Sequence, residues 1–279
     1  MLSLEDEDSY YHDVVDCVSI VIPTMNAAKT IGRCLESIVT QSYKNIEIFV
    51  VDRFSSDNTI EIASRFNASI HSFAGERASA KNFGISKSRG EFLLFIDSDM
   101  LLQPGVVQEC VTCCSNNKRI AGVIIPERSI GSGFWIKVRD FERSLYAGSK
   151  IESARFFIKK FVVQVGGFDE DIVFYEESTL PQKIEDIGMS INTRITSFIL
   201  HNEEGFTLRK WLHKKRYYSI STTSYSIKYS KYAKMQTSVF YRIKVFTTNG
   251  NWRALVRHPI LTIGVFILKI LEFFASRKG

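Results

Sequence analysis

Short runs of β-branched and aromatic residues alternate, through the first hundred positions, with segments in which apolar residues recur every three or four positions. Three of these runs predict buried parallel strands, at residues 18–23, 46–52 and 91–97. Ile31, Leu35 and Ile38 share one face at helical spacing, which predicts a helix between the first two strands. Alternating strands and helices indicate an α/β fold with a mostly parallel sheet flanked by helices.

The pattern continues into the second hundred residues. It predicts a strand near 69–73, helices at 78–88 and from 104, a strand at 120–125, a loop leading into a helix at 169–180, and a strand at 195–200. Cys110, Cys113 and Cys114 share one face of the helix that begins near 104, as cysteines do in some zinc sites and in buried apolar faces. No Cys/His pair at zinc-binding spacing accompanies them, which favours the buried face.

Composition excludes several classes of protein. Of the 279 residues, 45% are hydrophobic and 24% are charged, which argues against intrinsic disorder, collagen and a multi-span membrane protein. An odd number of cysteines, five in all, and an acidic N-terminus where a signal peptide would be basic and then apolar predict a cytoplasmic location.

Charge is distributed unevenly along the chain. Residues 201–279 hold 15 Lys/Arg and 3 Asp/Glu, whereas the whole chain has a net charge of +6. We therefore expect three parts: an acidic, disordered tail at 1–16, a folded α/β domain at 17–200, and a basic, aromatic-rich helical region at 201–279. By charge alone, such a region suits either nucleic acid or an anionic membrane surface.

Polar or turn-forming residues stand at the ends of three predicted strands: Pro23, Thr24 and Asn26, then Asp52, then Asp97, Ser98 and Asp99. These positions meet at one edge of a parallel sheet, where ligands bind in such folds. Asp97 and Asp99 are expected to share one side of a strand and to bind one Mg²⁺ or Mn²⁺, the alternative being that the segment is only a turn. No glycine-rich loop follows the first strand, which argues against a dinucleotide oxidoreductase or a P-loop enzyme.

Five segments, taken together and in order, resemble the family 2 glycosyltransferases: residues 18–26, 51–59, 76–84, 90–100 and 166–170. The resemblance covers residues 17–218. It implies the GT-A fold, a Rossmann-like architecture, and an inverting transferase that uses a nucleotide-sugar donor with Mn²⁺ or Mg²⁺ as cofactor.

The resemblance also implies roles for individual residues. The donor would be held by Pro23, Thr24, Asn26, Asp52, Lys81, Asp97 and Ser98, and Asp52 would accept a hydrogen bond from the base. The metal would be bound by Asp99 and Asp97, with His201 as a further ligand unless it is a plain surface or capping histidine. Arg53 departs from the family, which has an acid there, and Lys81 stands where arginine is more common.

The catalytic base of the family corresponds to Glu177, with Glu176 as the second choice. A carboxylate fits this role because the acceptor hydroxyl must lose a proton, and a neighbouring carboxylate tends to raise its pKa. The alternative is a helix N-terminus that favours negative charge. Glu177 replaces the aspartate of the family, and Thr179 replaces a later acid. Glu127, Arg143 and Arg155 stand where the family lines its sugar and acceptor sites, and Arg155 is expected either to meet a phosphate or to lie solvated on a strand.

The basic region suggests where the acceptor is met. Residues 208–218 interleave cations with aromatic side chains, and residues 259–275 are apolar except for Lys269 and Glu272. The second segment is too short and too polar for a comfortable membrane span, so it predicts an amphipathic helix in the membrane interface. The alternative is a helix packed on the catalytic domain.

These observations predict a metal-assisted, inverting glycosyltransferase that moves a sugar from a nucleotide-diphosphate donor, by single displacement, to a lipid-linked or polysaccharide acceptor. We expect it to be peripheral on the cytoplasmic face of a membrane. One alternative is a catalytically degenerate GT-A binding protein, because the base segment departs from the family. A nucleic-acid-binding protein is disfavoured, because no recognition motif accompanies the basic charge.

Overall fold

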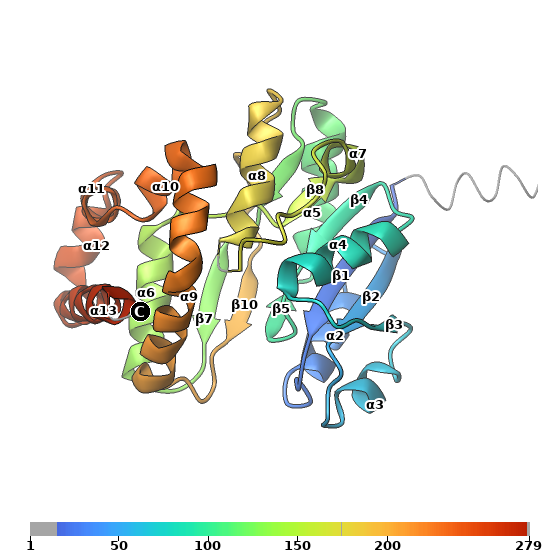
Figure 1. The fold of residues 1–279 in the computed structure, drawn as a ribbon, viewed down its shortest axis with the longest axis horizontal. Coiled ribbons are helices and arrows are strands. Elements are labelled where there is room, and N and C mark those ends of the chain that lie inside the picture. The colour runs from blue at the N-terminus through green and yellow to red at the C-terminus, as the bar shows by residue number, and fades with distance from the viewer. Residues whose placement is uncertain (1–15, 174, 278–279) are drawn as a thin grey trace, which may run out of the picture.

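A computed structural model of the protein describes residues 16–173 and 175–277 (Figure 1). Apart from Asp16, the tail predicted at 1–16 lies outside the described residues. Figure 1 shows an α/β core with the C-terminal helices gathered at one end, away from the first strands.

A seven-stranded sheet forms the centre of the molecule. In spatial order its strands are β3 (Ser69–Ser72), β2 (Ile46–Asp52), β1 (Val18–Thr24), β4 (Phe92–Phe95), β8 (Phe156–Ile158), β6 (Gly122–Ile124) and β9 (Thr193–Arg194). The strands from β3 to β4 pair in parallel, as do β6 and β9, whereas β8 is antiparallel to both of its neighbours. The predicted mostly parallel sheet is confirmed.

Seven described helices belong to this part of the chain: α2 (Ile31–Val39), α3 (Thr59–Ala63), α4 (Arg77–Lys87), α5 (Val106–Asn116), α6 (Phe134–Leu145), α7 (Lys159–Gln164) and α8 (Glu176–Asp186). Their apolar faces explain their positions, because Ile31, Leu35 and Ile38 of α2 are all buried against the sheet.

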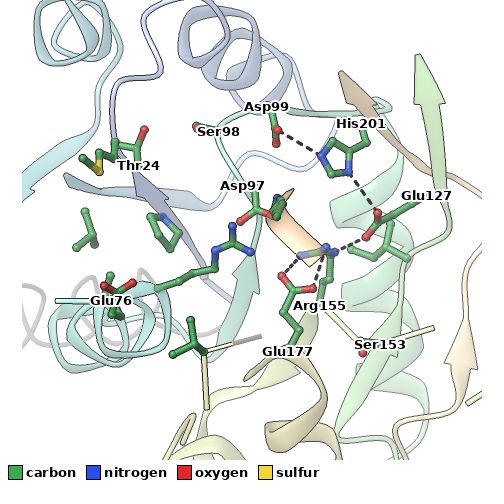
Figure 2. Close-up of a pocket in the computed structure, with 18 of the residues that line it drawn as sticks. Thr24, Glu76, Asp97, Ser98, Asp99, Glu127, Ser153, Arg155, Glu177 and His201 are labelled. Carbon is green, nitrogen blue, oxygen red and sulfur yellow. Dashed lines mark hydrogen bonds and ion pairs between the residues drawn. The ribbon is translucent and has the colours of Figure 1, made fainter. Parts of the chain in front are cut away.

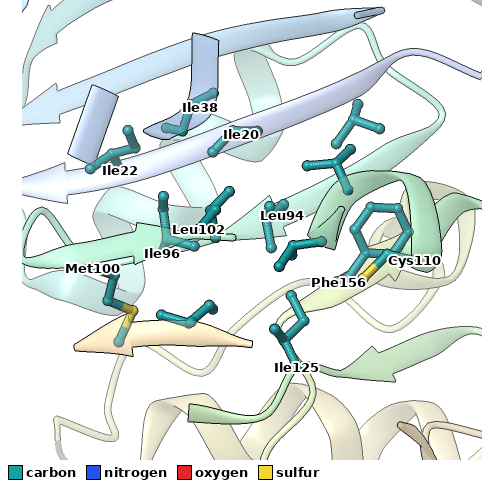
Figure 3. Close-up of a cluster of buried hydrophobic side chains, with 14 of the residues drawn as sticks. Ile20, Ile22, Ile38, Leu94, Ile96, Met100, Leu102, Cys110, Ile125 and Phe156 are labelled. Atoms are coloured by element: carbon teal, nitrogen blue, oxygen red, sulfur yellow. The ribbon is translucent and has the colours of Figure 1, made fainter. Parts of the chain in front are cut away.

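Apolar side chains cover both faces of the sheet. On one face, Ile20 and Ile22 of β1 join a cluster that also contains Cys110 (Figure 3), and on the other face Val21 packs in a second cluster. The alternation follows from the two-residue period of a strand. Cys110 and Cys114 are buried, as expected for an apolar helix face.

A second, smaller sheet has three strands. It consists of β5 (Met100–Leu102), β10 (Ile199–Asn202) and β7 (Glu127–Ile130), with β10 antiparallel to β5 and parallel to β7. The strand predicted at 195–200 is wrong in position, because the backbone N–H groups of Thr196 and Ser197 donate to the Glu109 carboxylate instead of a neighbouring strand.

From Leu208 onward the chain is mainly helical, with α9 (Leu208–Lys228), α10 (Ser230–Gln236), α11 (Val239–Thr247), α12 (Asn251–Arg257) and α13 (Pro259–Arg277), whereas residues 201 and 202 of the predicted basic region belong to β10. Val265 and Leu268 of α13 are fully buried against α6, in one cluster with Val138. A Cβ added to Gly264 would lie 2.5 Å from Val138, so the two helices approach closely. One face of α13 is thus packed on α6.

Candidate active site

A cavity of about 600 Å³ opens at the carboxyl ends of β1 and β4. Its walls come from the loop after β1, the N-terminal ends of α4 and α8, the turn after β4, and residues of β7, α6 and α9. The volume lies within the range of about 300–1,000 Å³ that is typical of small-molecule sites.

The predicted donor-binding residues fall into two groups. Pro23, Thr24, Asp97 and Ser98 line the cavity, together with the predicted metal ligands Asp99 and His201 (Figure 2). Asp52, Asn26 and Lys81 are not among the lining residues.

Asp52 and Asn26 hold the loop that follows β2. The buried Asp52 carboxylate accepts hydrogen bonds from the backbone N–H and the hydroxyl of Ser55. Asn26 has a positive φ of 50°, and its amide oxygen accepts from the backbone N–H of Ser56 at 2.9 Å. These contacts fix the shape of the loop beside the cavity. Lys81 is fully buried and lies 3.3 Å from Glu177 and 3.6 Å from Glu176.

The expectation that Asp97 and Asp99 share one side of a strand is wrong. Strand β4 ends at Phe95, and a tight turn closes as the Met100 N–H donates to the Asp97 carbonyl at 3.0 Å. The turn leads into β5, which belongs to the smaller sheet. Asp99 faces His201. Burial by itself raises the pKa of Asp97, but the guanidinium of Arg77 acts in the opposite direction, and the pKa of Asp97 is lowered.

Acidic and basic side chains alternate along one wall of the cavity. Asp99 Oδ2 lies 3.3 Å from His201 Nε2, and His201 Nδ1 lies 3.7 Å from Glu127 (Figure 2). Arg155 then bridges two carboxylates, because its Nε donates to Glu127 at 2.6 Å and its two terminal nitrogens donate to Glu177 at 3.1 and 3.3 Å. Arg155 is 7% exposed, so the interpretation as a solvated strand residue is wrong.

His201 is neither a surface nor a capping histidine, because it lies in this row of charges. Burial lowers its pKa, but the nearby Asp99 and Glu127 carboxylates outweigh burial and raise the pKa to about 9, against the opposing charge of Arg143, whose Nη2 lies 2.8 Å from His201 Nδ1. A histidine ligates a metal through an unprotonated nitrogen, and with Arg143 beside Nδ1 the nitrogen of His201 that could do so is Nε2, which faces Asp99.

Asp99 fits a divalent cation. Its Oδ1 is buried and accepts no hydrogen bond, and a buried carboxylate oxygen without a partner is costly unless a ligand satisfies it. Across residues 16–173 and 175–277, no three His, Cys, Asp or Glu side chains converge as a metal cluster. A cation at Asp99 would therefore take most of its ligands from the donor phosphates and water, as Mg²⁺ commonly does.

Glu176 and Glu177 form the first turn of α8, in agreement with the helix-terminus interpretation, but they differ in environment. Glu177 lines the cavity, whereas Glu176 is 1% exposed and lies beneath it. Burial raises the pKa of Glu176 to about 7. Burial acts on Glu177 in the same sense, but Arg155 and then Lys81 outweigh it and lower the pKa of Glu177. The raised pKa that was expected for Glu177 is therefore wrong, because cations surround this carboxylate.

Helix α9 supplies cavity residues that the sequence assigned to a membrane surface. Trp211, Lys214 and Tyr217, three positions apart on α9, all line the cavity. Behind them, the Arg139 guanidinium stacks 3.8 Å from the centre of the Trp211 ring and donates to the Glu203 carboxylate at 2.6 to 2.9 Å. The sequence feature that could have indicated this wall is the three-residue spacing of Trp211, Lys214 and Tyr217, which puts them on one face of a helix.

Comparison with known proteins follows the same segments. The family described as "Glycosyl transferase family 2" matches residues 19–168. The chain is 25% identical over 232 residues to hyaluronan synthase from Pasteurella multocida, covering 78% of this chain and 24% of that protein. It is 35% identical over 100 residues to glycosyltransferase GlyG from Streptococcus pneumoniae serotype 4, covering 33% of each. The chain thus spans no more than about a third of the length of these two relatives.

Two solved structures share the fold. Mannosyltransferase PcManGT from Pyrobaculum calidifontis, in complex with GDP-Man and Mn²⁺, aligns with a TM-score of 0.66 at 17% identity, covering 93% of this chain and 85% of that one. TarS from S. aureus, in complex with UDP-GlcNAc, aligns with a TM-score of 0.58 at 16% identity, covering 84% and 74%. The shared architecture is the GT-A fold.

Proposed function

Because this chain belongs to glycosyl transferase family 2, we propose that it transfers a sugar from a nucleotide-diphosphate donor to a hydroxyl group of a glycan or lipid-linked acceptor, with inversion. One observation carries the proposal. The turn that holds Asp97 and Asp99 and the Glu177 carboxylate enter the same cavity from different elements (Figure 2). A donor bound at this turn would therefore lie in the same cavity as the proposed proton acceptor.

The cavity has the charges that a diphosphate needs. Arg77, Arg143, Arg155 and Lys214 contribute cationic groups to its lining. Guanidinium groups bind phosphate oxygens through paired, charge-assisted hydrogen bonds. A divalent cation held by Asp99 would neutralise charge on the two phosphates and on the departing nucleotide.

Glu177 would remove the proton of the acceptor. The acceptor oxygen attacks the anomeric carbon, its proton moves to a Glu177 oxygen, and the bond from that carbon to the nucleoside diphosphate breaks on the opposite face. The lowered pKa keeps Glu177 ionised at neutral pH, which is the form a base requires. A bound diphosphate adds negative charge beside the same cations and would therefore raise the pKa of Glu177 toward a more basic value.

The acceptor would enter along α9. Trp211 and Tyr217 offer flat apolar surfaces next to polar groups, a combination common in sites for sugars and other small molecules. PcManGT and TarS were solved with GDP-Man and UDP-GlcNAc respectively, so donors with either nucleotide are candidates for this chain.

One feature favours a second candidate, a nucleotide-sugar-binding protein without turnover. Glu177 is held by Arg155 and Lys81, and a carboxylate so stabilised is a weak base. The two candidates differ in nucleotide release but not in donor binding.

The test measures nucleotide release from UDP- and GDP-sugars with Mn²⁺, beside thermal stabilisation by the same donors. We expect release, and a loss of about 10² to 10⁴ in turnover for Glu177→Gln with donor binding retained. Glu61→Gln, which alters an exposed glutamate on α3, is the matched control and should be fully active. Binding without release by the unaltered protein would support the second candidate. An inactive Glu176→Gln beside an active Glu177→Gln would move the base to Glu176.

A further inference from the structure

Large apolar side chains are exposed together on the last three helices. The apolar face comprises Phe240 of α11, Val256 of α12, and Ile260, Ile263, Ile267 and Phe274 of α13. Phe240 is 85% exposed and Ile260 is 70% exposed. The three helices are joined by short turns and pack in sequence at one end of the molecule (Figure 1). Exposed apolar patches of this kind mark interaction surfaces in soluble proteins.

Lys269 and Glu272, the charged residues of α13 between 259 and 276, do not interrupt this face. Lys269 pairs with Glu142 of α6 and with Glu272, and Glu272 accepts from the Trp211 indole N–H at 2.6 Å. Both charges therefore lie on the packed side of α13, while the exposed apolar residues, with Ile270 between Ile267 and Phe274, recur at spacings of three and four along the other side. The sequence suggested a helix broken by charge, but between residues 259 and 276 the outer face of α13 carries none.

Exposed basic residues stand on two of the same helices. Lys244 of α11 and Arg253 and Arg257 of α12 are exposed, and the sequence from 205 to 271 contains no Asp or Glu. A second copy of this chain would bring these cations against one another, and a nucleic acid would leave six apolar side chains uncovered. An apolar interior beneath an anionic surface is offered by a lipid bilayer with acidic headgroups.

We propose that the apolar face docks on the surface of an anionic bilayer, with α13 lying in the plane of the interface. By length and composition alone, α13 could cross a membrane. Its other side, however, holds Val265 and Leu268 in the cluster with α6 and the ion pair between Lys269 and Glu142. Spanning would expose or unpair those groups in lipid, so α13 inserts only one side. This docking requires neither donor nor acceptor and is independent of the proposed function.

The test is flotation of the full chain with vesicles of phosphatidylcholine alone and of phosphatidylcholine mixed with phosphatidylglycerol. We expect flotation with the mixed vesicles and at least a ten-fold weaker partition for Ile263→Glu/Ile267→Glu, because each isoleucine loses its burial in lipid. Neutralising Lys244, Arg253 and Arg257 to glutamine should weaken binding to mixed vesicles about five-fold per charge and leave binding to neutral vesicles unchanged. Val163→Glu is the matched control, since Val163 is 58% exposed on α7 at the other end of the molecule (Figure 1).

Three results would overturn the proposal. The double variant could float as well as the unaltered protein. The unaltered protein could fail to bind vesicles and instead form a dimer that Ile263→Glu/Ile267→Glu dissociates. The bound protein could resist an alkaline carbonate wash, which would show a spanning helix. Circular dichroism and thermal unfolding of each variant establish that its fold is intact, and these exposed positions should tolerate substitution.

Discussion

Replacing Arg155 by methionine tests the row of charges that holds Glu177. The substitution keeps an unbranched side chain of similar length but removes three hydrogen bonds, one to Glu127 and two to Glu177. Both carboxylates would keep their charge in a largely buried place without this partner. Removing one member of a buried ion pair costs about 3–5 kcal/mol. We expect Arg155→Met to lower the free energy of unfolding in urea by about that amount at pH 7.

The pH dependence of this loss has a definite sign. The folded-state pKa of Glu177 is lowered, so its contribution to stability is present above the ordinary glutamate pKa and is lost as the pH falls through the folded value. A protonated Glu177 has no need of a cation. The difference between Arg155→Met and the unaltered protein should therefore be largest near neutral pH and shrink on acidification below about pH 4.

Two further variants sharpen the comparison. Arg128→Met is the matched control, because the Arg128 side chain is 53% exposed and pairs with Asp140 at the surface, where an ion pair contributes less than about 1 kcal/mol. Adding Glu177→Gln to Arg155→Met should recover part of the lost stability, since one stranded charge is removed. If Arg155→Met costs no more than Arg128→Met, the assignment of Arg155 as the partner that holds Glu177 is refuted.

Three shorter predictions concern other parts of the chain. Asp99→Ala should abolish the Mn²⁺ dependence of donor affinity in a calorimetric titration while leaving the fold intact, and unchanged dependence would remove Asp99 from the metal site. Asp169 pairs with Lys228 of α9 at 2.8 Å, and its pKa is lowered from 3.8 to about 2, so the ionised carboxylate stabilises the fold when the pH is above 3.8. Asp169→Asn should lower the free energy of unfolding in urea by about 1 kcal/mol at pH 7 and by less at pH 2. Gly264→Ala should lower the thermal midpoint despite the helix propensity of alanine, because its Cβ would lie 2.5 Å from Val138; a raised midpoint would contradict the close packing of α13 on α6.

The periodic part of the fold could be predicted from the sequence, and the turns less well. Strands β1 and β2 follow from runs of buried β-branched residues, because a parallel strand must be apolar on both faces. The end of β4 could not be found in this way, because Ile96 continues the apolar run although the strand stops at Phe95. The stop is imposed by β5, which pairs with β10 about a hundred residues later in the chain.

Cavity residues that belong to a short sequence motif could be predicted. Ion pairs between residues far apart in the sequence could not. Asp97, Ser98 and Asp99 line the cavity as the motif implies. The pairing of Arg155 with Glu127 and Glu177 joins positions 28 and 22 residues apart, and no sequence period connects them. The direction of the Glu177 pKa depends on that pairing. A neighbouring carboxylate is visible in the sequence, whereas the cations that outweigh it are brought in by the fold.

The C-terminal region shows why counting charges along one sequence misleads about a surface. Lys269 and Glu272 lower the apparent hydropathy of α13, but they contact Glu142 and Trp211, which lie on other helices. Their charges are used inside the protein, and the outer face is more apolar than the segment as a whole. For α9 the sequence misleads in the opposite direction. Trp211 and Lys214 belong to a basic, aromatic run that suggested a membrane surface, yet both line the cavity. The proposed membrane-docking face and the proposed acceptor wall can therefore be separated only when each side chain has been assigned to the element that it contacts. In this chain α9 packs against α13, and this packing fixes the two surfaces relative to one another.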